Sequence, residues 1–494
     1  MAAGRGTALL VTLAMLAATA AWAADDAVAR AMQLYDKRHY RDAARTLETA
    51  LPSLEPGRQA AASLTLGIVY LGTAELHREL SQSATPIQLE YLRAIAAIRG
   101  PGASRLASLY LGQTLLESGR PADAIKVLER FAAEPGVEPG LRAQAVAHLG
   151  LAHFLRKDAA TARALWNSLE ARDPQTKATL AAVYSRAGIT EPAPVALADA
   201  VLKDIGERPA ALVRQKLIGV YTRAGLTARA LALLEQTDLK APSSTEVLGP
   251  AKVINFYDPA LLGELAMLYR HASRLALERA AADARVKGTA EYYLGAAFLE
   301  AGDGERALQA TRAFLALPGA PPAYRNRARV REATAQSLLA RRADGGSAWA
   351  ALARDTAADP ELLADIVAAC VRHRLECTEI EPRAVRAAEA GERRKTAALN
   401  AALGTYHLRR GDLPRAVAYL ESARDKSHKN RIEANDPVLL VNLAEAYYRS
   451  TQFSESLEIY FEMSQQFPVV RRLQEPLQGV YSMTHKSAGD VKIF

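Results

Sequence analysis

Residues 397–423, AALNAALGTYHLRRGDLPRAVAYLESA, carry two short apolar stripes at helical spacing, separated by a tight turn. The first stripe ends at Gly411 and Asp412, which are typical of a helix end and of the start of the next helix. Gly404 and Ala416 are small where two packed helices approach closely, and leucines of the second stripe fill the space between them. The stretch therefore predicts a hairpin of two antiparallel helices.

Imperfect copies of this hairpin recur along most of the chain after residue 27. Clear copies carry Gly112, Gly150 and Gly295 in their first helices. Helix starts are also marked by Asp-Pro pairs, because Asp caps a helix and Pro suits its first turn. These pairs are Asp173-Pro174, Asp258-Pro259, Asp359-Pro360 and Asp436-Pro437. We therefore expect a chain made almost entirely of helical hairpins.

The repeated pattern resembles the tetratricopeptide repeat, whose unit is a pair of antiparallel helices of about 34 residues with small residues at the crossing. The resemblance implies an all-α solenoid in which each hairpin contacts its neighbours. The composition agrees with this, because 50% of the residues are hydrophobic and only 6% are aromatic. The copies lie further apart than the family's unit, so we expect irregular repeats.

The longest stretch without helical periodicity predicts a linker or loop at residues 238–258, which include APSSTEVLGPAKVINFYD. An N-terminal solenoid is then expected over residues 24–237. A C-terminal solenoid with a capping helix is expected over residues 259–494. A solenoid grows by adding repeats, so the length of 494 residues does not by itself indicate three globular domains.

The N-terminus has the three parts of a secretory signal peptide: Arg5, an uncharged run over residues 7–21, and the small-residue triplet that ends at Ala23. We expect residues 1–23 to be removed and the mature chain to be periplasmic or secreted. An uncleaved membrane anchor is the alternative, although the run is slightly short for the roughly 20 residues that span a bilayer. No second stretch approaches that length, so we expect membrane contact only through a partner.

The only two cysteines are Cys370 and Cys377. In an oxidising compartment a disulfide between them is the leading interpretation, and a pair of buried free thiols is the alternative. His373 lies between them, but no further Cys or His pair supplies the remaining ligands of a metal site. We therefore predict a disulfide and no metal.

Sequence motifs that would indicate catalysis are missing. There is no Gly-x-Ser-x-Gly, no phosphate-binding Gly-x4-Gly-Lys-Ser/Thr and no His-Glu-x-x-His. The net charge of +8 is dispersed, without a block of Lys and Arg interleaved with aromatics. We therefore predict no enzymatic activity, no catalytic residues, no cofactor and no nucleic-acid partner, whereas an acidic partner is compatible with the charge.

A basic residue recurs two positions after the aromatic or histidine of the first helix in several copies. An offset of two residues is about 200° around a helix, so these side chains are expected to point away from the hairpin core. In the family that the sequence resembles, first helices line a concave groove where peptides bind. The resemblance therefore implies a partner-binding groove, with Tyr448 adding apolar contact and with the basic residues Arg186, Arg223, His271, Arg409 and Arg449.

Arginine in such a groove suits acidic side chains or a C-terminal carboxylate, because its guanidinium bonds carboxylates bidentately. An ordinary solvated face is the alternative interpretation of the same residues. The resulting hypothesis is a protein-binding scaffold or adaptor that supports envelope assembly, secretion or surface-structure biogenesis. Two further hypotheses stay open: self-association into an envelope or surface structure, and service as an accessory subunit of an envelope enzyme.

Overall fold

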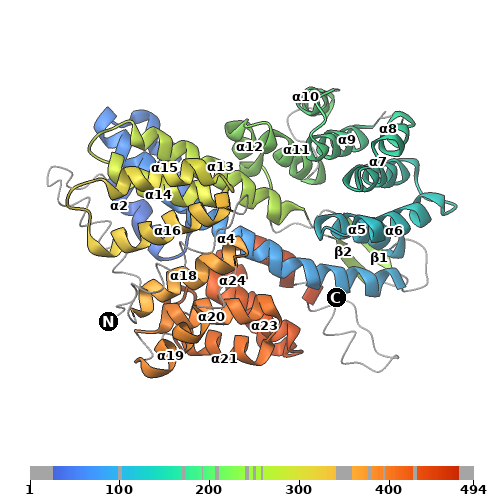
Figure 1. Cartoon of the computed structure of the whole chain (residues 1–494). Coiled ribbons are helices and arrows are strands. Elements are labelled where there is room, and N and C mark those ends of the chain that lie inside the picture. The colour runs from blue at the N-terminus through green and yellow to red at the C-terminus, as the bar shows by residue number, and fades with distance from the viewer. Residues whose placement is uncertain are drawn as a thin grey trace. The chain divides into compact units, whose positions relative to one another are not determined.

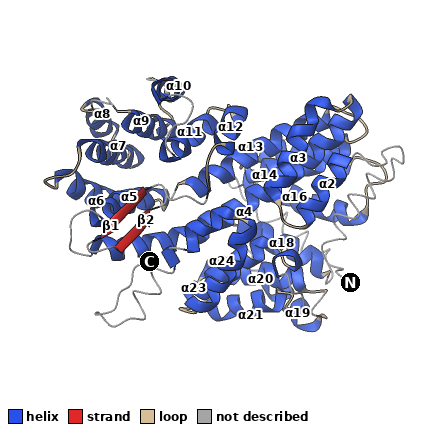
Figure 2. Ribbon diagram, turned by 180° about the vertical axis from the view of Figure 1, so that it is seen from behind, coloured by secondary structure: helices blue, strands red, loops and turns tan. Residues whose placement is uncertain are grey.

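The computed structural model consists of helices packed as successive hairpins (Figure 1), with one pair of short strands (Figure 2). It describes residues 26–97, 103–169, 173–191, 193–205, 211–239, 244–248, 252–256, 260–340, 359–375, 380–392, 395–426, 431–474 and 476–477. This architecture confirms the predicted α-solenoid of irregular, tetratricopeptide-like hairpins. The predicted signal peptide, residues 1–23, and part of the predicted capping helix lie outside the described residues.

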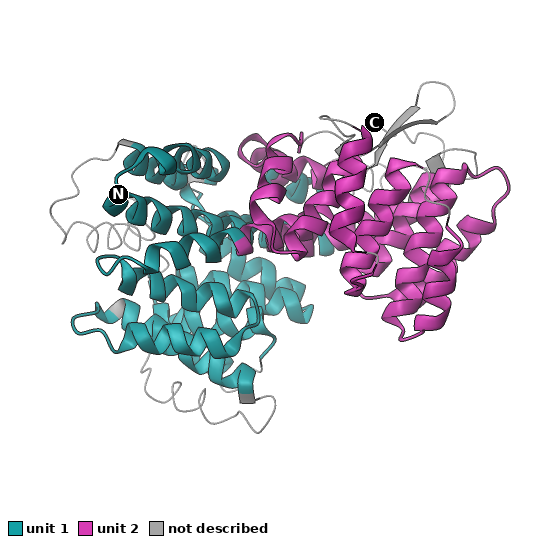
Figure 3. Ribbon diagram, turned by 90° about the horizontal axis from the view of Figure 1, so that it is seen from above, with its two compact units in different colours: residues 1–76, 272–459 teal, residues 77–271, 460–494 magenta. Residues whose placement is uncertain are grey.

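Two compact units make up the chain, and each is formed from two separate stretches of sequence (Figure 3). Unit 1 comprises residues 1–76 and 272–459, and unit 2 comprises residues 77–271 and 460–494. Three helices contribute residues to both units: α4 (Pro56–Ala97), α13 (Leu261–Ala281) and α24 (Phe453–Gln466). These units differ from the division at residues 238–258 that the sequence pattern indicates.

Unit 2 contains consecutive hairpins whose first helices pack on one another, α5 on α7, α7 on α9 and α9 on α11. The first helices are α5 (Ala103–Glu117), α7 (Pro139–Leu155), α9 (Pro174–Ala187) and α11 (Ala211–Arg223). The second helices are α6 (Pro121–Ala133), α8 (Ala159–Asn167), α10 (Pro194–Ile205) and α12 (Thr227–Glu235). The 3-10 turn η2 (Pro468–Val470) also belongs to this unit.

The predicted linker at residues 238–258 contains an antiparallel hairpin of two strands, β1 (Ser244–Leu248) and β2 (Lys252–Phe256). Their register pairs Ser244 with Phe256 and Leu248 with Lys252. Both strands contact α5 within unit 2. The lack of helical periodicity therefore reflects strand pairing in at least part of this segment.

Unit 1 contains the hairpin predicted for residues 397–423, which is formed by α20 (Ala397–Arg410) and α21 (Leu413–Ala423). Along this unit, α16 (Pro322–Ala340) packs on α18 (Pro360–His373), and α18 packs on α20. Both α20 and α21 pack on α23 (Pro437–Arg449). The other elements are α2 (Asp26–Asp36), α3 (Tyr40–Ala50), η1 (Leu51–Ser53), α14 (Lys287–Glu300), α15 (Gly304–Leu315), α19 (Glu381–Ala390) and α22 (Arg431–Ala434).

Side-chain caps fix several helix starts as the Asp-Pro pairs predict. Asp173 accepts a hydrogen bond from Thr176 N at 2.8 Å, Asp359 from Glu361 N at 3.0 Å, and Asp436 from Val438 N at 3.2 Å. The Asp258-Pro259 pair lies outside the described residues. A capping side chain supplies an acceptor that the first turn of a helix otherwise lacks, so these starts are set locally.

Glycines in the first helices allow the two helices of a hairpin to approach closely. A Cβ at Gly112 would lie 2.5 Å from Leu128 Cδ2, and a Cβ at Gly404 would lie 2.5 Å from Leu420 Cγ, across the hairpin in each case. The facing pairs are Gly112 with Leu128, Gly150 with Trp166, Gly295 with Thr311, and Gly404 with Leu420. In all four pairs the partner follows the glycine by the same number of residues, so one packing geometry is repeated along the chain.

A contact between residues far apart in sequence explains why unit 1 is discontinuous. Gly67 on α4 faces Leu277 on α13, where a Cβ would stand 2.6 Å from Leu277 Cγ. Ser273 Oγ also donates to the Gly67 carbonyl at 2.7 Å, across 206 residues of sequence. Hairpin periodicity reports contacts between neighbours only, and it therefore gave no sign of this packing.

Cys370, the first cysteine of the predicted disulfide, lies in the last turn of α18 and is 1% exposed. The helix ends there with Arg374 in the left-handed region at φ 54°, and Leu375 N donates to the Cys370 carbonyl at 2.8 Å. Cys377 lies outside the described residues. The Cys370–Cys377 disulfide therefore stays a prediction.

If that disulfide forms, the exported protein denatured without reductant will show no reactive thiol. Reduction of the denatured protein will then release both cysteine thiols, which a thiol-specific reagent and the mass of the alkylated protein will count. Two reactive thiols in the unreduced, freshly purified protein would favour the alternative of buried free cysteines.

A Gly150→Ala substitution is expected to lower the free energy of unfolding by about 1–3 kcal/mol, because extra atoms in a packed site cost that much. The added Cβ would stand 2.7 Å from Trp166 Cε2. The indole would have to move, although its Nε1 donates to the Ala147 carbonyl at 2.9 Å. Urea unfolding followed by circular dichroism measures the change.

Gly140→Ala on the same helix is the matched control. No neighbouring heavy atom lies within 4 Å of a Cβ built at Gly140 in the part of the chain that the structure describes. Because alanine is the better helix former by up to about 1 kcal/mol, stability should be unchanged or slightly raised. Equal losses in the two variants would show that close packing is not the reason for glycine at position 150.

Candidate partner-binding face

A polar network joins two neighbouring helices of unit 1, α20 and α23. Arg409 on α20 donates from Nη1 to Glu445 Oε2 at 2.7 Å and from Nη2 to Asn442 Oδ1 at 3.0 Å. Asn442 Nδ2 in turn donates to Thr405 Oγ1 at 3.1 Å. The Glu445 side chain is only 4% exposed. Since charge-assisted hydrogen bonds are about twice as strong as neutral ones, this network ties the two helices together.

Arg449 lies one turn beyond Glu445 on α23 and joins the same network. Its Nη1 donates to the Leu408 carbonyl at 2.9 Å and lies 3.5 Å from Glu445 Oε1. The side chains of Arg409 and Arg449 are 24% and 34% exposed. The fold therefore brings two of the predicted groove residues together around one buried carboxylate, with part of each guanidinium open to solvent.

Tyr448 does not share that exposure. It is 5% exposed, and its ring packs edge-on against Phe453 with the ring centroids 5.6 Å apart. Its side chain therefore fills the interior of the last hairpin of unit 1. The remaining predicted residues, Arg186, Arg223 and His271, belong to unit 2.

In unit 2 the predicted arginines also form ion pairs between helices. Arg186 on α9 pairs with Glu117 on α5, and Arg223 on α11 pairs with Glu264 on α13. His271, also on α13, is partly buried. Arg186 and Arg223 therefore contact carboxylates of the same chain, and both contribute to the stacking of the hairpins.

Gly219 makes room for the second of these pairs. A Cβ at Gly219 would stand 2.6 Å from Glu264 Oε2 and 3.0 Å from an Arg223 guanidinium nitrogen. Neither Gly219 nor Glu264 was predicted from the sequence. The only available signal was that glycine stands one turn before the predicted arginine, and that signal does not identify the helix that supplies the carboxylate.

A polar cluster joins three first helices of unit 2, α7, α9 and α11. Lys216 donates to Thr179 Oγ1 at 2.6 Å and to Gln144 Oε1 at 3.3 Å. His148, one turn after Gln144, is 7% exposed, and neither ring nitrogen has a hydrogen-bond partner among the described residues. Burial, together with the charges of Lys216 and Arg186, holds the pKa of His148 well below its usual value.

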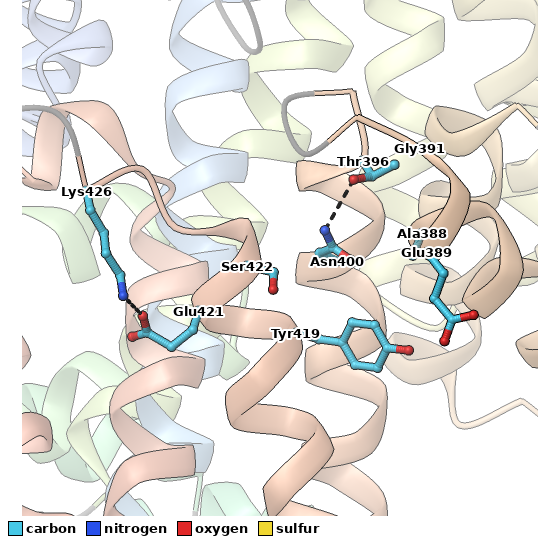
Figure 4. A pocket seen from close by; sticks show the side chains of 9 residues that line it. All are labelled: Ala388, Glu389, Gly391, Thr396, Asn400, Tyr419, Glu421, Ser422 and Lys426. Carbon is cyan, nitrogen blue, oxygen red and sulfur yellow. Dashed lines mark hydrogen bonds and ion pairs between the residues drawn. The ribbon is translucent and has the colours of Figure 1, made fainter.

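A pocket of about 500 Å³ lies in unit 1, where the ends of α19 and α21 meet the start of α20 (Figure 4). It is lined by Ala388, Glu389, Gly391, Thr396, Asn400, Tyr419, Glu421, Ser422 and Lys426. This pocket was not predicted from the sequence. Each lining residue is an ordinary choice for a helix surface or a turn, and only packing brings them together.

Metal-binding clusters and membrane-spanning helices are not found within the described residues. Within those residues, no group of three His, Cys, Asp or Glu is arranged to hold a metal ion. No helix in the same part of the chain is long and apolar enough to cross a membrane. The donors that the structure does gather on the first helices are guanidinium and ammonium groups, which suit carboxylates and other oxygen acceptors.

Comparison with known proteins gives no family assignment. No family model matches the chain, and no curated protein matches it. Among solved structures, yeast Tom70 is 12% identical and covers 94% of this chain and 97% of its own, with a TM-score of 0.34. The pentatricopeptide repeat protein PPR10 from maize is 16% identical and covers 97% of this chain and 73% of its own, with a TM-score of 0.25.

The buried His148 predicts a loss of stability in weak acid. Its pKa in the unfolded chain is about 6.5 and its folded pKa is lower, so below that pH the unfolded state binds more protons. Between pH 6.5 and 5.5 this residue should lower the free energy of unfolding by up to about 1 kcal/mol. Urea unfolding at the two pH values measures the effect.

His148→Met is the informative variant, because no hydrogen bond within the described residues is lost with the ring. The difference in unfolding free energy between pH 6.5 and 5.5 should shrink in this variant. An identical pH dependence in the two proteins would rule out His148 as its source.

Proposed function

We propose that this chain is a non-enzymatic scaffold or adaptor that binds a protein or peptide partner along the first helices of its hairpins. The observation that carries the proposal is the cluster of Arg409 and Arg449 around Glu445, where both guanidiniums remain partly exposed. Side-by-side first helices offer a long surface, and partly exposed guanidiniums bond carboxylates well. An acidic segment or a C-terminal carboxylate is therefore the partner chemistry that we propose.

The predicted signal peptide supports a location for this activity outside the cytoplasm, in the periplasm or beyond it. A scaffold there would support envelope assembly, secretion or surface-structure biogenesis. The proposal requires no catalysis by the chain itself, and the contacts described above are accounted for by packing and recognition. Two alternatives are self-association and service as an accessory subunit of an envelope enzyme. The identity of the proteins recovered in the capture experiment below distinguishes them.

The structure determines which variants can test this face. Reversing the charge of Arg409 would set a second carboxylate beside the buried Glu445, and an uncompensated buried charge costs about 3–5 kcal/mol. Removing Arg409 and Glu445 together avoids that penalty. A triple variant, Arg409→Gln, Glu445→Gln and Arg449→Gln, therefore removes the proposed contacts with the least damage to the fold.

The matched control carries Arg306→Gln and Arg415→Gln on the second helices α15 and α21. These side chains are 57% and 67% exposed and pair with Asp303 and Asp412 on the surface. Exposed pairs of this kind contribute about 0–1 kcal/mol, so the control should fold normally. It removes as many arginines as the triple variant does.

Affinity capture tests the proposal. The mature protein is the bait, and its partners are captured from the native envelope extract at low and high salt. We expect one partner to be recovered by the native protein and by the control, and to be lost from the triple variant and at high salt, because salt screens exposed charges. Equal recovery by all three proteins at both salt concentrations would overturn the basic face. Recovery of the chain alone would favour self-association.

A further inference from the structure

We propose that the pocket formed by α19, α20 and α21 binds a basic side chain, arginine in preference to lysine, presented by a segment of another protein. The pocket is built by residues other than Arg409 and Arg449. The inference therefore goes beyond the proposed function and does not depend on it.

Glu389 supplies the negative charge of this pocket. It is exposed in the last turn of α19, and within the described residues it makes no hydrogen bond or ion pair. That last turn contains no basic residue. The carbonyl groups at a helix C-terminus already carry a partial negative charge, which favours a cation there. An incoming cation would therefore meet both the carboxylate and the end of the helix.

The other charged groups around the pocket are paired within the chain. Glu421 pairs with Lys426 and accepts a hydrogen bond from Tyr447, and Arg424 lies 3.3 Å from its Oε1. On the connection from α19 to α20, Lys395 pairs with Glu392 at 3.2 Å. Arg393 and Arg394 lie outside the described residues. Among the described residues, Glu389 is thus the lining carboxylate without an ion-pair partner.

Further acceptors line the same space. In Figure 4 the Tyr419 hydroxyl and the Glu389 carboxylate point toward one another. The Tyr419 hydroxyl has no hydrogen-bond partner among the described residues, and its ring is held by stacking on His407 with centroids 5.5 Å apart. Asn400 donates its Nδ2 to Thr396 Oγ1 at 3.3 Å, which leaves its Oδ1 as an acceptor.

This set of acceptors selects the ligand. A carboxylate, a hydroxyl and an amide oxygen match the planar guanidinium, which has five N–H donors in a fixed arrangement, better than they match an ammonium group. The volume of about 500 Å³ falls within the range of about 300–1,000 Å³ that is usual for ligand pockets. Arginine on a flexible segment of a partner therefore satisfies both the chemistry and the size.

The test is calorimetric titration of the full-length mature protein with a blocked Gly-Gly-Arg-Gly-Gly peptide, beside the same peptide with citrulline in place of arginine. Citrulline keeps the shape and removes the charge. We expect saturable binding of the arginine peptide, and binding at least about tenfold weaker for citrulline and for Glu389→Gln, because hydrogen bonds to charged groups are the strong ones. Tyr419→Phe should weaken binding about threefold.

Glu305→Gln is the matched control, because Glu305 is an exposed glutamate of unit 1 on α15, outside the pocket lining. It should bind the arginine peptide as the native protein does, and so should the triple variant of the Arg409 face. Equal affinity for the citrulline peptide, unchanged binding by Glu389→Gln, or no saturable binding up to about 10 mM peptide, equivalent to less than about 3 kcal/mol, would overturn the proposal.

Discussion

Close packing of a helix backbone against a side chain of the next helix is the constraint on which the hairpins depend. Gly112, Gly150 and Gly404 each face a large side chain at a distance that leaves no room for a Cβ. Because the helix axes can then approach closely, apolar surface is buried with few aromatic residues. The same glycine positions recur along the chain, so the solenoid is a repetition of one local contact.

Stacking of the hairpins adds a polar requirement. Glu445 and Glu264 are buried carboxylates, and each meets an arginine from the neighbouring first helix, Arg409 and Arg223 respectively. Loss of either arginine would remove a charge partner from a buried carboxylate, which is costly. The arginines that the sequence indicates as groove residues therefore also stabilise the fold. The recognition that we propose for unit 1 uses the part of Arg409 and Arg449 that stays exposed.

Much of the fold was predictable because its signals are local. The Asp-Pro starts confirmed at Asp173, Asp359 and Asp436 depend on hydrogen bonds within one helical turn. The candidate site was only partly predictable. The positions of Arg409 and Arg449 followed from the repeat, whereas their carboxylate partner and the burial of Tyr448 depend on how one hairpin sits on the next, for which periodicity carries no information.

The sequence by itself determined the hairpins, their turns and the helix starts, because each is fixed by residues within one or two helical turns or across one hairpin. Only the tertiary structure decided which stretches form a unit, since the contact of Gly67 with Leu277 and Ser273 joins segments that share no local pattern. It also decided where a pocket lies. Glu389, Asn400 and Tyr419 come from three helices, and only packing of their ends places them around one space.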